Sequence, residues 1–258
     1  MSRVVIVKGL EPVVSTVKAF QMIKADVDEV LSSKKTILIK PNYINSQLPS
    51  TGVTTDSRVV EGILKFLRLL KIGEIIIGEG SGFADTFEAF KVAGVDVVAE
   101  RWGVKLVDLN KDEFVEVYPP DPLSLRRVKV AKTALESTII SVPKLKLHRM
   151  ATITLSLKNM MGALASKGSM HNGELSKNIA DLASVLKPSI SVVDGTIAGE
   201  GHETSGKPVK MNLVIAGTDP VAVDAVGAEV MGIPSTDVEH LVFAEKKGLG
   251  TCNPEKIT

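Results

Sequence analysis

The sequence is poor in cysteine, in aromatic side chains and in long apolar runs. Its 258 residues include one Cys, one Trp and two Tyr, and aromatic residues make up 4% of the chain. A single cysteine excludes an intrachain disulfide framework, a cysteine-rich zinc site and a cysteine-ligated iron–sulfur cluster. The scarcity of stacking side chains argues against a binder of single-stranded nucleic acid.

A surplus of charge is also missing. Lys and Arg total 31, Asp and Glu total 30, and the formal net charge is +1. Nucleic-acid binders need an excess of Lys and Arg, so we expect no nucleic-acid partner. No stretch approaches the roughly 20 apolar residues of a membrane helix, and the apolar run at residues 4–7 is too short for a signal peptide. We therefore expect a cytoplasmic protein without a membrane partner; its oligomeric state stays open.

Short β-branched runs alternate with longer amphipathic stretches along the chain. Hydrophobic residues make up 44% of it, which is sufficient for a full core, and only two Gln stand beside plentiful Lys and Glu, a trait of thermophiles. Because the expected strands are apolar throughout, we predict an α/β fold: a mostly parallel open sheet with helices on both faces. The predicted strands are 36–39, 74–77, 104–109, 137–142, 189–193 and 211–216; the predicted helices are 59–70, 83–93, 175–186, 220–231 and 236–247.

One segment, residues 112–132, interrupts this alternation. Pro119, Pro120 and Pro122 suit neither a long helix nor a central strand. We predict a β-hairpin excursion or small subdomain there, within a single α/β domain that spans residues 1–258. Helix starts are predicted at Thr55 or Asp56 and at Asp219, where Pro220 occupies the first helical position.

Polar segments directly follow several of the predicted strands. In open α/β sheets the ligand crevice lies outside the carboxyl ends of the strands. If the strands are parallel, these segments converge on one edge of the sheet and form a site there. The segments are 40–42, 78–82, 143–148, 194–195 and 217–220.

The segment Gly78-Glu79-Gly80-Ser81-Gly82 is a glycine-rich strand-to-helix turn. Backbone N–H groups of Gly80, Ser81 and Gly82 could bind an anion at a helix N-terminus. The glycine spacing does not match the dinucleotide fingerprint, and Glu79 would repel phosphate if it pointed inward. An ordinary tight turn is therefore an equal alternative to a phosphate cradle.

Lysines and hydroxyl groups alternate with apolar residues in two adjacent segments. Lys144, Lys146 and His148 share one side of the first segment if it is extended, and the second repeats the pattern with Thr152, Thr154, Ser156 and Lys158. Two such strands would build a wall suited to phosphate or carboxylate groups; the alternative is a solvated strand face. A lysine whose pKa is lowered by neighbouring cations could act as a base or as a Schiff-base nucleophile.

Residues 201–208 resemble a P-loop but do not match it. Pro208 stands where a P-loop has its magnesium-binding Ser or Thr, and a predicted strand follows where a P-loop has a helix. We expect a loop over the site, from which Glu200 and His202 reach in. The histidines show no metal-ligand spacing, so we assign no metal site. Mg²⁺ stays open as a cofactor, with five carboxylates as candidate ligands: Asp181, Asp194, Glu200, Asp219 and Asp224.

The motifs at these positions together resemble a known family, the domain of unknown function 362. The resemblance runs from about Ile37 to Gly250, and the family name carries no established general reaction. Many relatives carry ferredoxin-type cysteine clusters, whereas this chain has only Cys252, so the resemblance covers the core domain and no iron–sulfur cluster is expected. The motifs are 40–42, 143–148, 157–162, His171, 193–195 and 219–224.

Two functions follow as alternatives. The first is an enzyme of unknown reaction that binds a small anionic, phosphorylated or carboxylated ligand in a Lys/His-lined cleft. Its catalytic residues would be Lys146, His148 and His171, and its ligand-binding residues Lys40, Asn42, Gly80, Ser81, Gly82, Lys144, Lys158, Asn159 and Asp194. The second is a non-catalytic binding or redox-accessory protein that partners an iron–sulfur protein.

Overall fold

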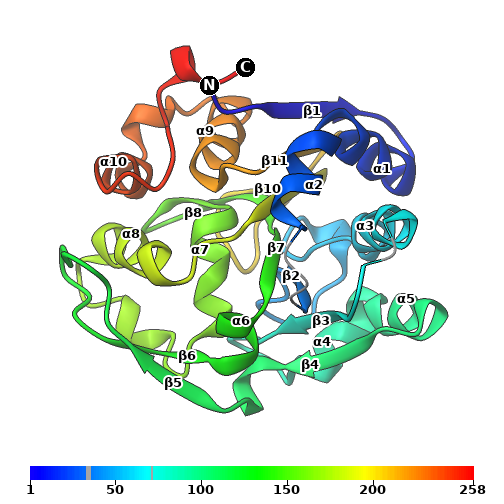
Figure 1. Cartoon of the computed structure of the whole chain (residues 1–258), viewed down its shortest axis with the longest axis horizontal. Helices are drawn as coiled ribbons and strands as arrows, with labels where there is room; N and C mark the ends of the chain where they lie inside the picture. The colour runs from blue at the N-terminus through cyan, green and yellow to red at the C-terminus, as the bar shows by residue number, and fades with distance from the viewer. Residues whose placement is uncertain (33–35, 71) are drawn as a thin grey trace.

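A mixed sheet of nine strands forms the centre of the computed structural model, which describes residues 1–32, 36–70 and 72–258 (Figure 1). The pairs β10–β7, β7–β2, β2–β3 and β3–β4 are parallel, as is β8 beside β10. The sheet is therefore mostly parallel, as the sequence predicts. Its strand order is β1 (Val4–Lys8), β11 (Lys207–Gly217), β10 (Ile190–Glu200), β7 (Thr138–Val142), β2 (Ile37–Pro41), β3 (Ile75–Glu79) and β4 (Lys105–Asp108), with β8 (Lys144–His148) and β9 (Thr152–Thr154) joined to β10.

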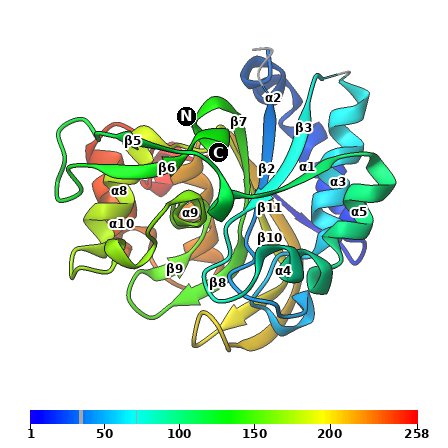
Figure 2. The same ribbon diagram turned by 90° about the horizontal axis from the view of Figure 1, so that it is seen from below.

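Helices cover both faces of the sheet (Figure 2). One core contains residues of α1 (Pro12–Met22), α2 (Lys24–Val30), α3 (Ser57–Leu69), α4 (Thr86–Ala93) and α5 (Val95–Trp102). The other contains residues of α6 (Lys132–Glu136), α7 (Ser156–Asn159), α8 (Leu175–Val185), α9 (Pro220–Val230) and α10 (Glu239–Lys246).

The strands bury side chains on both sides, which confirms the interpretation of their apolar runs. In β2, Leu38 belongs to one core while Ile37 and Ile39 belong to the other. Short 3-10 helices fill several connections: η1 (Pro49–Thr51), η2 (Leu109–Lys111), η3 (Met160–Ala163), η4 (Gly168–Met170), η5 (Ser235–Asp237) and η6 (Pro254–Lys256). Among the described helices, none combines the length and apolar content needed to cross a bilayer.

Two predicted helix starts are confirmed by their capping hydrogen bonds. Asp56 accepts from the backbone N–H of Arg58 at the start of α3. Asp219 accepts from Val221 and Ala222 at the start of α9, with Pro220 in the first turn. Each carboxylate satisfies N–H groups that the first helical turn leaves without intrahelical partners.

The predicted excursion is a β-hairpin. β5 (Phe114–Val117) pairs antiparallel with β6 (Val128–Ala131) in a separate two-stranded sheet. The prolines lie in the connection between the two strands, where no ladder hydrogen bond is needed from them.

Several local expectations are wrong. β10 continues past Val193 to Glu200, so Asp194 and Gly195 lie within a strand and not after it. β11 runs antiparallel to β10, with Gly217 opposite Ser191, because a short hairpin connection joins the two strands. Residues 217–220 therefore lie at the opposite edge of the sheet from the other polar segments. The second extended segment is also shorter than predicted: β9 ends at Thr154, and Ser156 and Lys158 lie in α7.

Candidate functional site

A cavity with a volume of about 280 Å³ lies where β2 and β3 end, beside β8. Many residues that the sequence predicts for the site line it: Asn42, Gly80, Gly82, Lys146, His148, Lys158, Asn159 and His171. Thr154 of the predicted wall and Glu79 of the glycine-rich turn also line it. Sequence reasoning did not assign the remaining lining residues to the site: Ile44, Phe83, Met161, Gly162, Lys167, Gly168, Glu203 and Thr204.

Four predicted ligand-binding residues lie outside this lining. Lys144 Nζ is 2.7 Å from Asp194 Oδ2 in a fully buried ion pair. Ser81 donates its hydroxyl hydrogen to the carbonyl of Tyr43 at 2.7 Å. Lys40 lies behind the cavity wall, where it pairs with Glu79. These contacts place the four side chains behind the cavity lining, which they support, and direct binding of a ligand by them stays a prediction.

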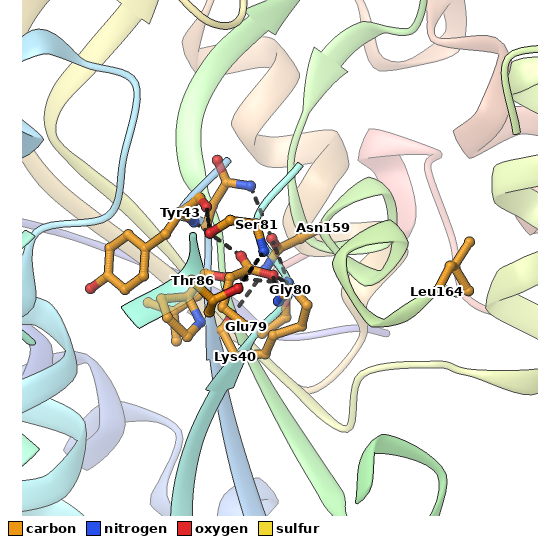
Figure 3. Close-up of polar contacts among 12 residues, drawn as sticks. Lys40, Tyr43, Glu79, Gly80, Ser81, Thr86, Asn159 and Leu164 are labelled. Atoms are coloured by element: carbon orange, nitrogen blue, oxygen red, sulfur yellow. Dashed lines mark hydrogen bonds and ion pairs between the residues drawn. The ribbon is translucent and has the colours of Figure 1, made fainter. Parts of the chain in front are cut away.

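Lys40 and Glu79 form the centre of this support (Figure 3). Lys40 Nζ lies 2.7 Å from Glu79 Oε1, and Glu79 Oε2 accepts the backbone N–H of Tyr43 at 3.0 Å. Burial lowers the pKa of Lys40, and the charge of Glu79 opposes that shift. The carboxylate of Glu79 thus faces the ammonium of Lys40. This pairing neutralises the charge with which an inward Glu79 would have repelled a phosphate.

The ion pair also fixes the orientation of two amides. Lys40 Nζ donates to Asn159 Oδ1 at 3.3 Å, and Asn42 Nδ2 donates to the same oxygen at 3.1 Å. Asn159 Nδ2 donates to the carbonyl of Lys40 at 3.0 Å. Because an ammonium cannot accept a hydrogen bond, Asn159 must present its oxygen to Lys40, and Asn42 must then present its nitrogen to Asn159.

The N–H groups of the glycine-rich turn are already engaged. Gly80 donates to Glu79 Oε1 at 2.8 Å, Ser81 to Thr86 Oγ1 at 3.2 Å, and Gly82 to the carbonyl of Ile44 at 3.1 Å. β3 continues through Gly78 to Glu79, beyond the predicted end. These bonds favour the tight-turn alternative over an anion cradle.

Two lysines of the predicted wall reach the cavity. Lys146 Nζ donates to the carbonyls of Val53 and Glu203 at 2.9 and 3.0 Å. Lys158 Nζ has no hydrogen-bond or ion-pair partner within the described part of the chain. Burial lowers the pKa of Lys146 to about 7, with added repulsion from Lys158 and Lys144. Burial also lowers the pKa of Lys158 to about 8, which Glu203 opposes.

Lys158 reaches the cavity because α7 is anchored at its start. Asp224 Oδ1 and Oδ2 accept the backbone N–H groups of Ser156 and Leu157 at 2.7 and 2.9 Å. Burial raises the pKa of Asp224 to about 7. The hydrogen bonds from α7 to Asp224 of α9 therefore position Lys158. The alternating pattern of the sequence had predicted this lysine on a strand.

Lys167 and Glu203 join the lining from two loops. Lys167 donates to Asn110 Oδ1 and to the carbonyl of Leu164, and burial lowers its pKa. Glu203 belongs to the predicted loop over the site, but it lines the cavity where Glu200 and His202 were expected. No spacing in the sequence distinguishes Glu203 from its neighbours; only the fold of the hairpin connection selects it.

The Nδ1 atoms of the two cavity histidines differ in their hydrogen bonds: that of His148 accepts, and that of His171 donates. His148 Nδ1 accepts the backbone N–H groups of Met150 and Ala151, each at 3.1 Å. His171 Nδ1 lies 3.3 Å from the carbonyl of Lys167, to which it donates. Their rings stack with centroids 6.4 Å apart. Burial lowers the pKa of His148 to about 3, and the charge of Lys158 adds to the shift.

The candidate magnesium ligands do not gather at one point. Asp181 accepts three backbone N–H groups of residues 123–125, and Asp219 caps α9. Asp194 pairs with Lys144, and Asp224 accepts backbone N–H groups of α7. Glu200 lies at the exposed end of β10. Within the described residues no cluster of three His, Cys, Asp or Glu side chains could hold a metal ion. The magnesium expectation stays untested.

Two polar atoms of lining residues have no hydrogen-bond partner in the described structure. They are Asn42 Oδ1 and Thr154 Oγ1, and both residues are more than nine-tenths buried. An unsatisfied buried polar atom costs about 1–3 kcal/mol, so these positions suit water or a ligand that supplies the missing bonds.

The chain is similar in sequence to known proteins. The family described as "Domain of unknown function (DUF362)" matches residues 37–229, a range that contains every cavity residue named above. A protein of Synechocystis named as thylakoid-associated is 23% identical over 226 residues, which cover 83% of this chain and 68% of that protein. No solved structure matches the chain.

Proposed function

This chain belongs to the DUF362 family, and from that premise we propose that its cavity binds a small molecule bearing a phosphate or carboxylate group. The observation that carries the proposal is Lys158, whose ammonium lines the cavity without an acidic or hydrogen-bonding partner in the described structure. The Lys158 side chain is partly buried. A cation that is held away from bulk water is costly unless it is paired, so an anion in the cavity would stabilise it.

The other charges around the cavity support an anion in the same place. Lys146 and Lys167 add two amines that are held by neutral oxygen atoms. Of the two lining glutamates, Glu79 is matched by Lys40 and leaves Glu203 as the one unmatched acid of the described lining. Cations in a low-dielectric cleft attract an anion more strongly than the same charges do at an open surface.

The size of the cavity limits the ligand. A volume of about 280 Å³ lies just below the range for small-molecule sites, roughly 300–1,000 Å³. Asn42 Oδ1 and Thr154 Oγ1 offer further bonds to polar groups of the ligand. We therefore propose a compact metabolite, with the protein acting on it as an enzyme whose reaction is not assigned.

We further propose a cytoplasmic location. A location at a membrane is the alternative, because the related protein of Synechocystis is named as thylakoid-associated. Separation of membrane and soluble fractions from cells that produce this chain would decide the point. Recovery of most of the chain with membranes that resists a salt wash would contradict a cytoplasmic location.

Thermal unfolding with sulfate, phosphate, pyruvate and glycerol 3-phosphate tests the binding proposal. We expect at least one anion to raise Tm at millimolar concentration, and Lys158→Met to abolish the rise. Lys210→Met is the matched control, because Lys210 is an exposed lysine of β11 outside the cavity. No response to any anion, together with co-purification of an iron–sulfur protein, would favour the redox-accessory alternative.

A further inference from the structure

The hydrogen bonds of His148 determine where its ring carries a proton. A backbone N–H can only donate, so Nδ1, which receives the N–H groups of Met150 and Ala151, must be unprotonated. The neutral ring then holds its proton at Nε2, which lies 3.7 Å from Glu203 Oε1 in the cavity lining. Protonation of Nδ1 would break two backbone bonds, so His148 cannot readily serve as a base.

The hydrogen bonds of Lys146, in contrast, leave its amine free to gain or lose a proton. Two of its N–H groups are held by the carbonyls of Val53 and Glu203, which leaves one tetrahedral position of Nζ. That position is a lone pair in the neutral amine and a third N–H in the ammonium. Both protonation states therefore keep both carbonyl bonds.

The same geometry separates proton transfer from Schiff-base formation. An iminium nitrogen has only one N–H, so a covalent adduct at Lys146 would surrender at least one of the two carbonyl bonds. Loss of the bond to Val53 would leave a buried acceptor unsatisfied, which is costly. Loss of the bond to Glu203 would leave a partly buried carbonyl. Gain or loss of a proton requires no such loss.

We propose that Lys146 is the proton acceptor for the bound anion, and that His148 is a fixed neutral donor through Nε2. When a ligand carries an acidic proton, the lone pair of Nζ takes it, the X–H bond breaks, and its electron pair stays on the ligand. Lys146 then becomes an ammonium beside the new anion. This inference rests on the proposed anion site and names the residue that changes charge there.

The charged groups around Lys146 come from several elements. Lys158 of α7 and Lys144 of β8 disfavour its ammonium, whereas Glu203 of the β10–β11 connection and Glu79 of β3 favour it. A bound anion adds negative charge to this balance and favours the ammonium further. Binding of an anion above neutral pH should therefore draw protons into the protein.

Sulfate is a suitable probe because it does not itself titrate near neutral pH. At pH 8 an amine with a pKa of about 7 is roughly nine-tenths neutral, and one with a pKa of about 8 is roughly half neutral. Calorimetric titration with sulfate in two buffers of different ionisation enthalpy measures proton uptake. We expect little uptake at pH 6, substantial uptake at pH 8, and a loss of more than half of it in Lys146→Arg, which stays charged.

The control variants decide between the neighbouring groups. Lys158→Arg should lower the uptake at pH 8 by less than Lys146→Arg does. If His171→Gln abolishes the uptake instead, or if the native protein binds sulfate with equal uptake at pH 6 and pH 8, the assignment of Lys146 is overturned. Failure of sulfate to bind at all would remove the proposed anion site, and this inference with it.

The donor role of His148 is tested without a ligand. Long-range proton–nitrogen spectra of ¹⁵N-labelled protein distinguish the two tautomers of each of the four histidines, and His148→Gln identifies the signals of His148. We expect protonated Nε2, unprotonated Nδ1 and no titration of His148 between pH 5 and pH 9. A midpoint within that range, or a protonated Nδ1, would contradict the assignment.

Discussion

Lys144 Nζ lies 2.7 Å from Asp194 Oδ2, and neither side chain is accessible to solvent. The two residues are register partners on the neighbouring parallel strands β8 and β10. Asp194 also accepts the backbone N–H groups of Asp56 at 2.7 Å and Thr196 at 2.9 Å. The pair therefore ties the start of α3 to the strands beside the cavity, a role in support of the site.

Replacement of Lys144 by Met should destabilise the protein by about 3–5 kcal/mol, because it leaves Asp194 buried without its counter-charge. Urea unfolding measures the loss. Lys132→Met is the matched control, since its ion pair with Glu113 is exposed and should contribute little. A Lys144→Met protein with native stability but no sulfate binding would show instead that Lys144 contacts the ligand.

Gly162 allows η3 to approach the Lys40–Glu79 pair. A Cβ atom at this position would lie 2.2 Å from Glu79 Oε1 and 2.6 Å from Lys40 Nζ. Gly162→Ala should therefore destabilise the protein by about 1–3 kcal/mol, as overpacking of an interior typically does.

Gly168→Ala is the control for this substitution, because a Cβ at Gly168 meets nothing within 4 Å. Both variants are compared by urea unfolding. Equal stability of the two variants would show that η3 shifts to accommodate the methyl group.

Sulfate affinity should fall as pH rises through the range of about 7 to 8. Burial holds the pKa values of Lys146 and Lys158 at about 7 and about 8, well below the ordinary lysine value, so both amines lose their charge there. His148 stays neutral across this range and contributes no pH dependence. We expect a decrease of roughly tenfold or more between pH 6 and pH 9, measured by calorimetry. A flat profile would mean that neither amine binds the anion.

The two nitrogen atoms of His148 can be tested separately. His148→Asn keeps a short polar group near Nδ1 for the loop at Met150 and Ala151, but it lacks the donor at Nε2. His148→Gln places an amide N–H near Nε2. We expect sulfate to bind His148→Gln more tightly than His148→Asn, by about 1 kcal/mol for one hydrogen bond. The reverse order would show that the loop contacts outweigh the donor in the cavity.

Several parts of the fold follow from local patterns in the sequence. Asp56 and Asp219 start helices because their side chains satisfy N–H groups within the next three residues. The apolar run of β2 predicts a strand buried on both sides, and alternation in β8 predicts that Lys146 and His148 share a side. Each of these features depends on residues close together in the chain.

Other parts depend on contacts between distant residues. The sequence shows a lysine at position 40 and a glutamate at position 79, but only the pairing of β2 with β3 brings them together. The direction of β11 follows from its hairpin with β10, and the place of Lys158 follows from the bond between Asp224 and α7. Lys167 and Glu203 enter the lining from loops whose spacing carries no signal.

Local patterns alone place lysines and histidines where the predicted strands end, because hydrophobic periodicity and strand alternation involve residues close together in the chain. Which of these cations are neutralised depends on the tertiary structure. Lys40 and Lys144 meet buried carboxylates, whereas Lys146 meets only carbonyls and Lys158 meets no partner in the described chain. Charge pairing acts over a few ångströms of space, and the distance between two residues in space is set by the fold and not by their separation along the chain.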